Sequence, residues 1–306
     1  MKIVLQTLSV IFVLLVFALS FTLATTPSAK TINDCLVTKM HKVSLCSKNR
    51  DYVRLNDVSA YFKNLLLIAE DSAFYQHKGF DWEELENSFL SNLKDKKISR
   101  GGSTITQQLA KNVYLNFDRT LTRKFREAIL AAQIEKQLSK NQILEKYINV
   151  IEFGKNIFGL HKAARHYFNK HPSELGLLES AYLVYLIPNP RVHSQTFKNQ
   201  KLTDYSRYRI LDLIFKLYKT KRIQLDDYLA AKEVINLFPW NNLTATEVPS
   251  ELSVLENSAT SEDETNLAPV EAAPSAEEAL SSEDFYEESS PAPPTEIIEE
   301  EPTFDE

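Results

Sequence analysis

Two glutamates in this sequence stand where a carboxylate could do chemistry. Glu70 follows the apolar run LLLIA and precedes Asp71. A carboxylate at the C-terminus of an apolar helix faces the negative end of the helix dipole and loses solvent, and both effects raise its pKa. A raised pKa suits a general base. The competing interpretation is an acid that pairs locally with His77 or Lys78.

The second glutamate, Glu127, ends a strongly basic stretch. It lies four residues after Arg123 and three after Lys124, so these charges share a helix face. An ordinary surface ion pair would contribute under about 1 kcal/mol. Arg119 and Arg126 bring the stretch to four cations, more than one glutamate needs. Such a group suits a diphosphate, because arginine binds its oxygens in pairs and lysine acts as a point charge.

Between the two glutamates, glycines 101–102 precede a predicted helix. We expect Ser103 to be its N-cap. Ser103, Gln107 and Lys111 recur at every fourth position and therefore share a face, opposite an apolar face that begins at Ile105. A glycine turn that leads into a helix N-terminus offers free N–H groups to an anion. The alternative is an ordinary amphipathic helix with a polar outer face.

The elements that must position these residues are predicted to be helices. From Val58 to about Pro239, apolar residues recur at helical spacing and strand-like alternation is rare. The recurring sets include Tyr61, Leu65 and Ile68, and Phe125, Ile129 and Ala132. Ser139 and Gln142 form a capping box, and the segment that follows them is predicted to be scaffold. Residues 57–246 are therefore predicted to form one helical domain.

The N-terminal segment Ile3–Ala24 is a run of 22 uncharged, mostly apolar residues, long enough to span a bilayer as a helix. A cleaved signal peptide is the alternative. We favour an uncleaved anchor over residues 1–29, followed by a loop-rich connector over 30–56. Cys35 and Cys46 lie in this connector, where a disulfide and two free thiols both stay open.

The charge is split along the chain. Residues 247–306 contain 19 acidic residues and no basic one, which leaves 35 basic and 22 acidic residues, a net charge of +13, in residues 1–246. Seven of the 12 prolines lie in the same acidic tail. That composition predicts a disordered tail. The basic body suggests an anionic partner such as membrane lipid, phosphate or nucleic acid, or only a solvated surface.

Four segments, taken in order, resemble the peptidoglycan glycosyltransferases, glycosyltransferase family 51. They are EDSAFYQHKG at 70–79, GGSTITQQLAKN at 101–112, RKFRE at 123–127 and ILEKYIN at 143–149. The resemblance covers about residues 55–200. It implies a mainly α, lysozyme-like glycosyltransferase domain behind an N-terminal transmembrane helix. The chain is too short to add a transpeptidase domain, so a monofunctional biosynthetic transglycosylase is expected. Asn169 stands where the family usually has glycine.

The resemblance also implies roles for individual residues. Glu70 would be the general base that takes the proton from the 4-hydroxyl of the acceptor GlcNAc. Glu127 would assist departure of the lipid pyrophosphate by organising cations. The remaining expected substrate-binding residues are Ser103, Gln107, Gln108, Lys111, Arg119 and Lys124. No metal ligand is expected among them.

The implied substrate is lipid II, joined through a β-1,4 bond to the growing glycan chain with inversion and release of undecaprenyl pyrophosphate. No cofactor is expected for activation, and a divalent cation (Mg²⁺ or Mn²⁺) is left open. The expected location is the cell inner membrane, single-pass, with the catalytic domain in the periplasm. Expected partners are membrane lipid and, left open, other cell wall synthases or division proteins; nucleic acid is not expected.

Two other functions compete with this one. A lysozyme-like hydrolase of the same polymer would also be helical and carry paired carboxylates, but it would not need the cations around Glu127. A non-catalytic membrane scaffold could use the acidic tail to recruit basic partners. Intact Glu70 and Glu127 argue against a scaffold.

Overall fold

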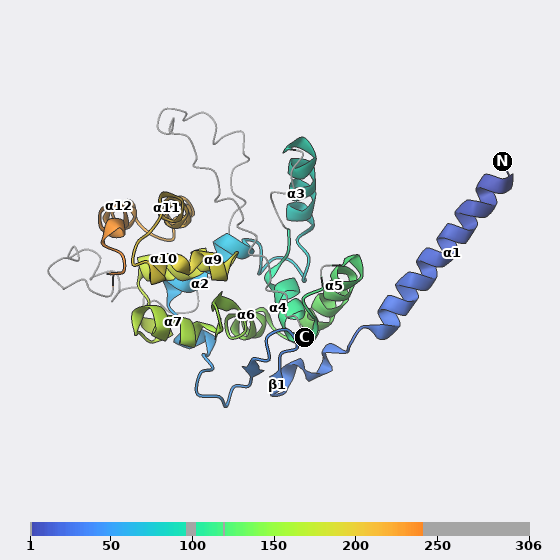
Figure 1. Ribbon diagram of the computed structural model, residues 1–306, viewed down its shortest axis with the longest axis horizontal. Helices are drawn as coiled ribbons and strands as arrows, with labels where there is room; N and C mark the ends of the chain where they lie inside the picture. The colour runs from blue at the N-terminus through green and yellow to red at the C-terminus, as the bar shows by residue number, and fades with distance from the viewer. Residues whose placement is uncertain (1, 96–101, 119, 241–306) are drawn as a thin grey trace, which may run out of the picture.

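The computed structural model describes residues 2–95, 102–118 and 120–240 and shows a helical body with one long helix extending away from it (Figure 1). The prediction of a mainly α fold is confirmed. The predicted tail, residues 247–306, and Arg119 lie outside the described residues.

The α-helices are α1 Lys2–Thr25, α2 Ala60–Glu70, α3 Trp82–Asp95, α4 Ile105–Tyr114, α5 Leu121–Glu135, α6 Lys140–Ile148, α7 Leu160–Phe168, α8 Leu177–Leu186, α9 Pro190–His193, α10 Gln195–Lys198, α11 Asp204–Lys219 and α12 Leu225–Val234. The strands are β1 Leu36–Val37, β2 Ser44–Leu45, β3 Glu152–Gly154 and β4 Ile157–Phe158, and the short 3₁₀ helices are η1 Ala29–Asn33, η2 Leu55–Asp57, η3 Pro172–Glu174 and η4 Ile235–Leu237.

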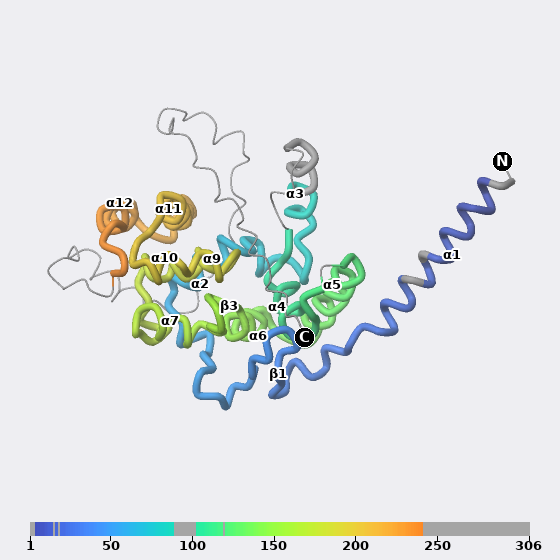
Figure 2. The backbone as a smooth tube through the Cα atoms, viewed as in Figure 1, coloured from blue at the N-terminus to red at the C-terminus, as the bar shows by residue number. Residues whose placement is uncertain are grey.

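Helix α1 stands apart from the body (Figure 2). The large apolar side chains described in it, from Val4 to Leu23, are exposed, and it is the one helix among the described residues that is long and apolar enough to cross a membrane. An N-terminal signal sequence has the same character, so this helix is compatible with membrane anchoring without excluding cleavage.

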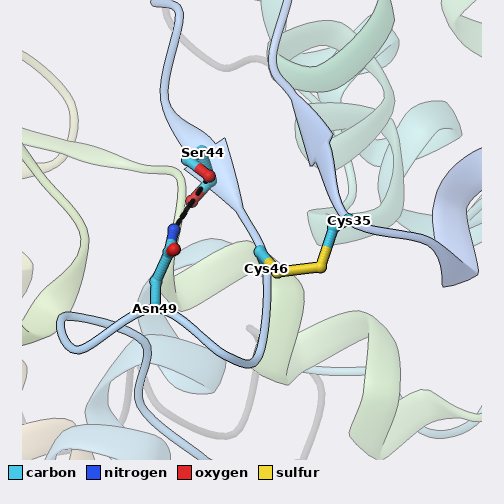
Figure 3. Close-up of a disulfide and its surroundings, with 4 residues drawn as sticks. All are labelled: Cys35, Ser44, Cys46 and Asn49. Carbon is cyan, nitrogen blue, oxygen red and sulfur yellow. Dashed lines mark hydrogen bonds between the residues drawn. A yellow bond between two sulfur atoms is a disulfide. The ribbon is translucent and has the colours of Figure 1, made fainter.

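The predicted connector folds onto the body. Strands β1 and β2 pair antiparallel, with Leu36 opposite Leu45, and a Cys35–Cys46 disulfide joins the two arms (Figure 3). The structure thus decides between the two alternatives for these cysteines. Beside the disulfide, Asn49 Nδ2 donates to Ser44 Oγ at 2.8 Å (Figure 3).

The β1–β2 hairpin also caps helix α4. The backbone N–H groups of Lys39 and Met40 donate to the carbonyls of Val113 and Asn112, at 2.8 and 3.4 Å. These carbonyls belong to the last turn of α4, whose C=O groups have no partner within the helix. The hairpin therefore supports the far end of a helix that carries predicted site residues.

The core surrounds α2. This helix packs against α8 and α11, while α4 packs against α5 and α6. Leu65 and Leu66 of α2 are fully buried, and every residue of α8 is buried. Figure 1 shows α7, α10, α11 and α12 at one end of the body and α3 and α5 at the other.

The helix predicted from the recurrence of Phe125, Ile129 and Ala132 is α5, but these residues do not mark its buried face. Phe125 is 57% exposed, whereas Leu130 and Ile134 are fully buried. Two overlapping stripes of apolar residues on α5 recur at helical spacing. The stripe that is buried, with Leu130 and Ile134, also carries the buried Glu127.

Asn169, which replaces the family's usual glycine, ends α7 with φ of +53°. This is the left-handed conformation typical of a helix C-terminus, where glycine is favoured and asparagine is tolerated best among other residues. The substitution therefore keeps the local backbone.

Candidate active site

Glu70 is the last residue of α2, and its side chain is only partly exposed. Its Oε2 accepts a hydrogen bond from Gln108 Nε2 at 2.8 Å. Burial raises the pKa of Glu70, and the neighbouring Asp71 adds to this, while Gln108 and the Lys111 ammonium pull the pKa down less strongly. The net direction is upward, as a general base requires.

The neighbouring carboxylate, Asp71, has a different role. It is buried at the C-cap of α2, and its Oδ2 accepts from the backbone N–H of Ile105, the first residue of α4, at 2.9 Å. Its Oδ1 lies 2.8 Å from Nε2 of His77. The local pairing considered for the two acids is therefore made by Asp71, which leaves Glu70 to the site.

The N-cap of α4 is Thr104, so the expectation that Ser103 caps this helix is wrong. Thr104 Oγ1 accepts from the Gln107 N–H, and Gln107 Oε1 accepts from the Thr104 N–H, both at 3.2 Å. The reciprocal pair is a capping box, and it requires a spacing of three residues. The T-x-x-Q pattern at 104–107 already held this signal.

Ser103 consequently precedes the helix and does not extend the Gln107–Lys111 face. Its hydroxyl accepts a hydrogen bond from Lys124 Nζ of α5 at 2.6 Å. Gln107 is buried, with its amide oxygen turned back to the helix start. The predicted apolar face of α4 is confirmed, since Ile105 and Leu109 are fully buried.

Lys111 interacts electrostatically with both glutamates. Burial lowers its pKa, the carboxylates of Glu127 and Glu70 raise it, and Arg123 and Lys124 lower it further. The resulting direction is downward. A partly desolvated ammonium attracts an anion more strongly than one in bulk water, because the local dielectric constant is lower.

Glu127 is buried, with 3% of its side chain exposed. Its Oε2 accepts from Arg123 Nη1 at 3.1 Å and its Oε1 from Lys124 Nζ at 2.7 Å. The interpretation as a plain surface ion pair therefore fails for the carboxylate, although Lys124 remains about half exposed. Glu127 holds two cations in place beside Ser103 and Lys111.

Arg126, a third cation of the basic stretch, does not join this group. Arg126 points toward the N-terminal helix, where its Nη2 donates to Thr25 Oγ1 at 2.9 Å. Arg119 lies outside the described residues, so its predicted role stays a prediction.

One group of side chains could in principle hold a metal ion. Ligand atoms of Asp71, His77 and Asp81 lie within 4.8 Å of one another. His77 Nδ1 accepts from the Gly79 N–H at 3.1 Å, which leaves the ring proton on Nε2 for Asp71. Asp81 Oδ1 accepts from the Glu84 N–H at 2.8 Å. These atoms already have partners, so the group fits a structural network better than a metal.

The site thus contains a glutamate with a raised pKa, a buried glutamate that holds two cations, and a lysine that interacts electrostatically with both. The family described as Transglycosylase matches residues 37–214, more than half of the chain. The chain belongs to the transglycosylase family. The resemblance seen in the four sequence segments is confirmed.

Individual transglycosylases support this assignment. The chain is 40% identical over 169 residues to a biosynthetic peptidoglycan transglycosylase of Nitrosomonas eutropha, covering 55% of this chain and 69% of that protein. Proteins of the same name from Alcanivorax borkumensis and Methylobacillus flagellatus are 45% and 42% identical over 160 and 144 residues. Those two matches cover 52% and 47% of this chain, and 62% and 63% of the relatives, slightly less than two thirds of their lengths.

The expected enzyme class, a peptidoglycan glycosyltransferase acting in cell wall synthesis, is therefore confirmed. None of these matches assigns a role to a single residue. The roles of the site residues follow from geometry and are proposals.

Proposed function

We propose that this transglycosylase polymerises lipid II into β-1,4-linked glycan strands, with inversion at the anomeric carbon and release of undecaprenyl pyrophosphate. The observation that carries the proposal is that Lys111 interacts electrostatically both with Glu70, whose pKa is raised, and with Glu127, which holds two cations. A proton acceptor on one side and positive charge on the other are what transfer from a diphosphate requires.

In the proposed reaction, Glu70 takes the proton of the acceptor GlcNAc 4-hydroxyl. The oxygen attacks the donor anomeric carbon from the face opposite the pyrophosphate, and the bond from that carbon to the pyrophosphate oxygen breaks. The electron pair leaves with the diphosphate, where Lys111, Arg123 and Lys124 stabilise the developing charge. Glu127 positions two of these cations and transfers no proton.

The remaining predicted residues line the donor side of the site in this proposal. The hydrogen bond from Lys124 to Ser103 supports placing both at the diphosphate. Gln108 contacts Glu70 and is proposed to act there. Because Gln107 is buried and uses its amide oxygen to cap α4, its proposed contact with the donor sugar is assigned to its amide nitrogen. Arg119 is proposed to contact the diphosphate.

The sugar arrives already activated, so the proposed reaction needs no cofactor for activation. A divalent cation (Mg²⁺ or Mn²⁺) is proposed only as a counter-ion of the substrate diphosphate. The enzyme is proposed to be held in the cell inner membrane by α1, with its body in the periplasm. There it would meet membrane lipid, the growing glycan chain and other cell wall synthases or division proteins.

The decisive experiment incubates the purified full chain with labelled lipid II and separates the products by size. We expect glycan polymer from the unchanged enzyme and a loss of at least about 100-fold in Glu70→Gln, since a general base contributes about 10²–10⁴-fold. Glu233→Gln, which changes an exposed glutamate of α12, is the matched control and should keep full activity.

Two outcomes would contradict the proposal. Shortened glycan from preformed sacculi, without polymer from lipid II, would indicate a hydrolase. Full polymerisation by Glu70→Gln would exclude Glu70 as the base.

A further inference from the structure

Helix α6, which the sequence suggested was only scaffold, reaches the base through one side chain. Tyr147 of α6 is fully buried, and its hydroxyl donates to Gln108 Oε1 at 2.8 Å. Gln108 Nε2 in turn donates to Glu70 Oε2 at 2.8 Å. The chain of hydrogen bonds therefore runs from α6 through α4 to the end of α2.

The direction of these hydrogen bonds follows from the chemistry of the groups. An ionised carboxylate only accepts, so Gln108 must turn its NH₂ group toward Glu70. Its carbonyl oxygen then faces Tyr147, which must donate. Burial raises the pKa of Tyr147 well above its ordinary value, so the phenol keeps the proton that it donates. The two ends of an amide have nearly the same shape, and only their hydrogen-bond partners distinguish them.

We propose that Tyr147 is a positioning residue of the polymerisation reaction: its hydroxyl fixes the Gln108 amide with the N–H group toward the Glu70 carboxylate. This inference rests on the proposed role of Glu70 as the base. Without the hydroxyl, the Gln108 carbonyl loses its donor, and besides the bond to Glu70 only a long contact from Gln108 Nε2 to the Ser103 carbonyl, at 3.5 Å, opposes a turn of the amide oxygen toward Glu70. An oxygen in that place repels the ionised base and favours its protonated form.

The other groups that act on Glu70 are the same in the presence and absence of this hydroxyl. Asp71 raises the pKa of Glu70 and Lys111 lowers it, while Tyr147 itself interacts with both Glu70 and Asp71. Loss of the Gln108 donor removes one of the two influences that lower the pKa. The pKa of Glu70 must then rise, and activity will fall at a higher pH as the solution is acidified.

The test is the pH profile of kcat/KM for lipid II polymerisation by the full chain and by Tyr147→Phe. The acidic limb should move to higher pH by roughly 1–2 units, the effect of losing one hydrogen bond to the charged form. Above that limb the two enzymes should agree within about threefold, because the ionised base is then present in both. An unshifted limb overturns the inference.

Tyr182→Phe is the matched control. Tyr182 is also fully buried and its hydroxyl bonds to Thr196 at 3.0 Å, among aromatic neighbours such as Phe238. This variant should lose stability, as measured by thermal unfolding, and keep its acidic limb in place. A limb that moves equally in both variants would show a general packing effect and overturn the role of Tyr147.

A double variant covers the case in which Tyr147→Phe does not fold. Tyr147→Phe with Gln108→Leu replaces both partners by apolar groups, which is often nearly neutral for stability. If Tyr147 acts through Gln108, this variant and Gln108→Leu alone must share one acidic limb. A further shift in the double variant overturns the inference. Polymerisation by Glu70→Gln would instead refute the proposed function, since the limb would then report another group.

Discussion

At the scale of single residues, the site separates two adjacent carboxylates by their surroundings. Asp71 pairs with His77 and accepts a hydrogen bond from the first N–H group of α4. Glu70 accepts one hydrogen bond, from the Gln108 amide, and interacts with the Lys111 ammonium. The buried, hydrogen-bonded acid is structural, and the acid with fewer compensating partners has the raised pKa that suits its proposed role as proton acceptor.

The raised pKa of Glu70 has a consequence for stability. Its pKa in the folded protein lies above the ordinary value of 4.5, so the folded state binds the proton more tightly than the unfolded state. Stability conferred by the protonated form is therefore lost as pH rises through the folded pKa. We expect Glu70→Gln to unfold at a higher temperature than the unchanged enzyme near pH 7.

Thermal unfolding of both proteins across pH checks this prediction. Their difference should shrink as pH falls through the raised pKa of Glu70 and level off below 4.5, where the glutamate of the unchanged enzyme is protonated in both states. A lower melting temperature for Glu70→Gln at pH 7 would contradict it.

Lys111 carries the second prediction at this scale. Lys111→Met removes an ammonium near both glutamates while keeping much of the side-chain length. Because a hydrogen bond to a charged group contributes about 1.5–3 kcal/mol, kcat/KM for lipid II should fall by roughly 10- to 150-fold. Lys232→Met, which changes an exposed lysine of α12, should keep normal kcat/KM. If Lys111→Met and Lys232→Met had equal kcat/KM, Lys111 would not bind the diphosphate.

At the scale of elements, the buried Glu127 of α5 holds two cations of the same helix, and one of them, Lys124, reaches the start of α4. Arg123, Lys124 and Glu127 lie within two turns of this helix, and Lys124 also bonds to Ser103 at the entrance of α4. Removing the acid leaves the cations unpaired, and an unpaired charge costs more than the pair contributes.

We therefore expect Glu127→Gln to lower the free energy of unfolding by about 1–3 kcal/mol and kcat/KM by more than about tenfold. Glu135→Gln is the control on the same helix, because Glu135 pairs with Lys140 at 2.7 Å in a comparable way. Denaturant unfolding should show a loss of stability in both variants. The loss of kcat/KM should appear only in Glu127→Gln, and equal kinetic losses would count against a specific role.

At the scale of the whole molecule, the segment between α1 and α2 links the apolar helix to the active-site body. Besides the hairpin that caps α4, Ala29 N–H donates to Gln133 of α5 at 2.8 Å, and Ile32 is fully buried. The segment predicted to be a loop-rich connector is therefore part of the folded unit.

The Cys35–Cys46 disulfide should stabilise this unit. It closes a loop with a sequence separation of 11, for which the chain-entropy model gives about 3 kcal/mol. Replacing both cysteines by serine should lower the free energy of unfolding by about that amount in denaturant titrations. Reducing agent should destabilise the unchanged enzyme to the same extent and leave the double variant unaffected. If the double variant and the unchanged enzyme had the same free energy of unfolding under oxidising conditions, the disulfide would not contribute to stability.

Features set within one or two helical turns could be predicted from the sequence. The Arg123–Glu127 and Lys124–Glu127 contacts and the Ser139–Gln142 capping box are confirmed, because helical geometry alone brings residues three and four apart together. The prediction of Ser103 as the N-cap of α4 is wrong, because the neighbouring Thr104 can also cap and takes that position. Ser103 therefore lies before the helix, where the spacing rule does not apply.

The sequence by itself determined the family and the helical character and indicated the two glutamates as candidates, because motif spacing and apolar periodicity are properties of the linear chain. Tertiary structure alone decided which stripe of α5 is buried, that Asp71 holds the start of α4, and that Tyr147 reaches Glu70 through Gln108. These contacts join residues from helices that pack side by side but lie far apart in sequence. Local geometry cannot specify them, because their distances depend on how the whole core packs.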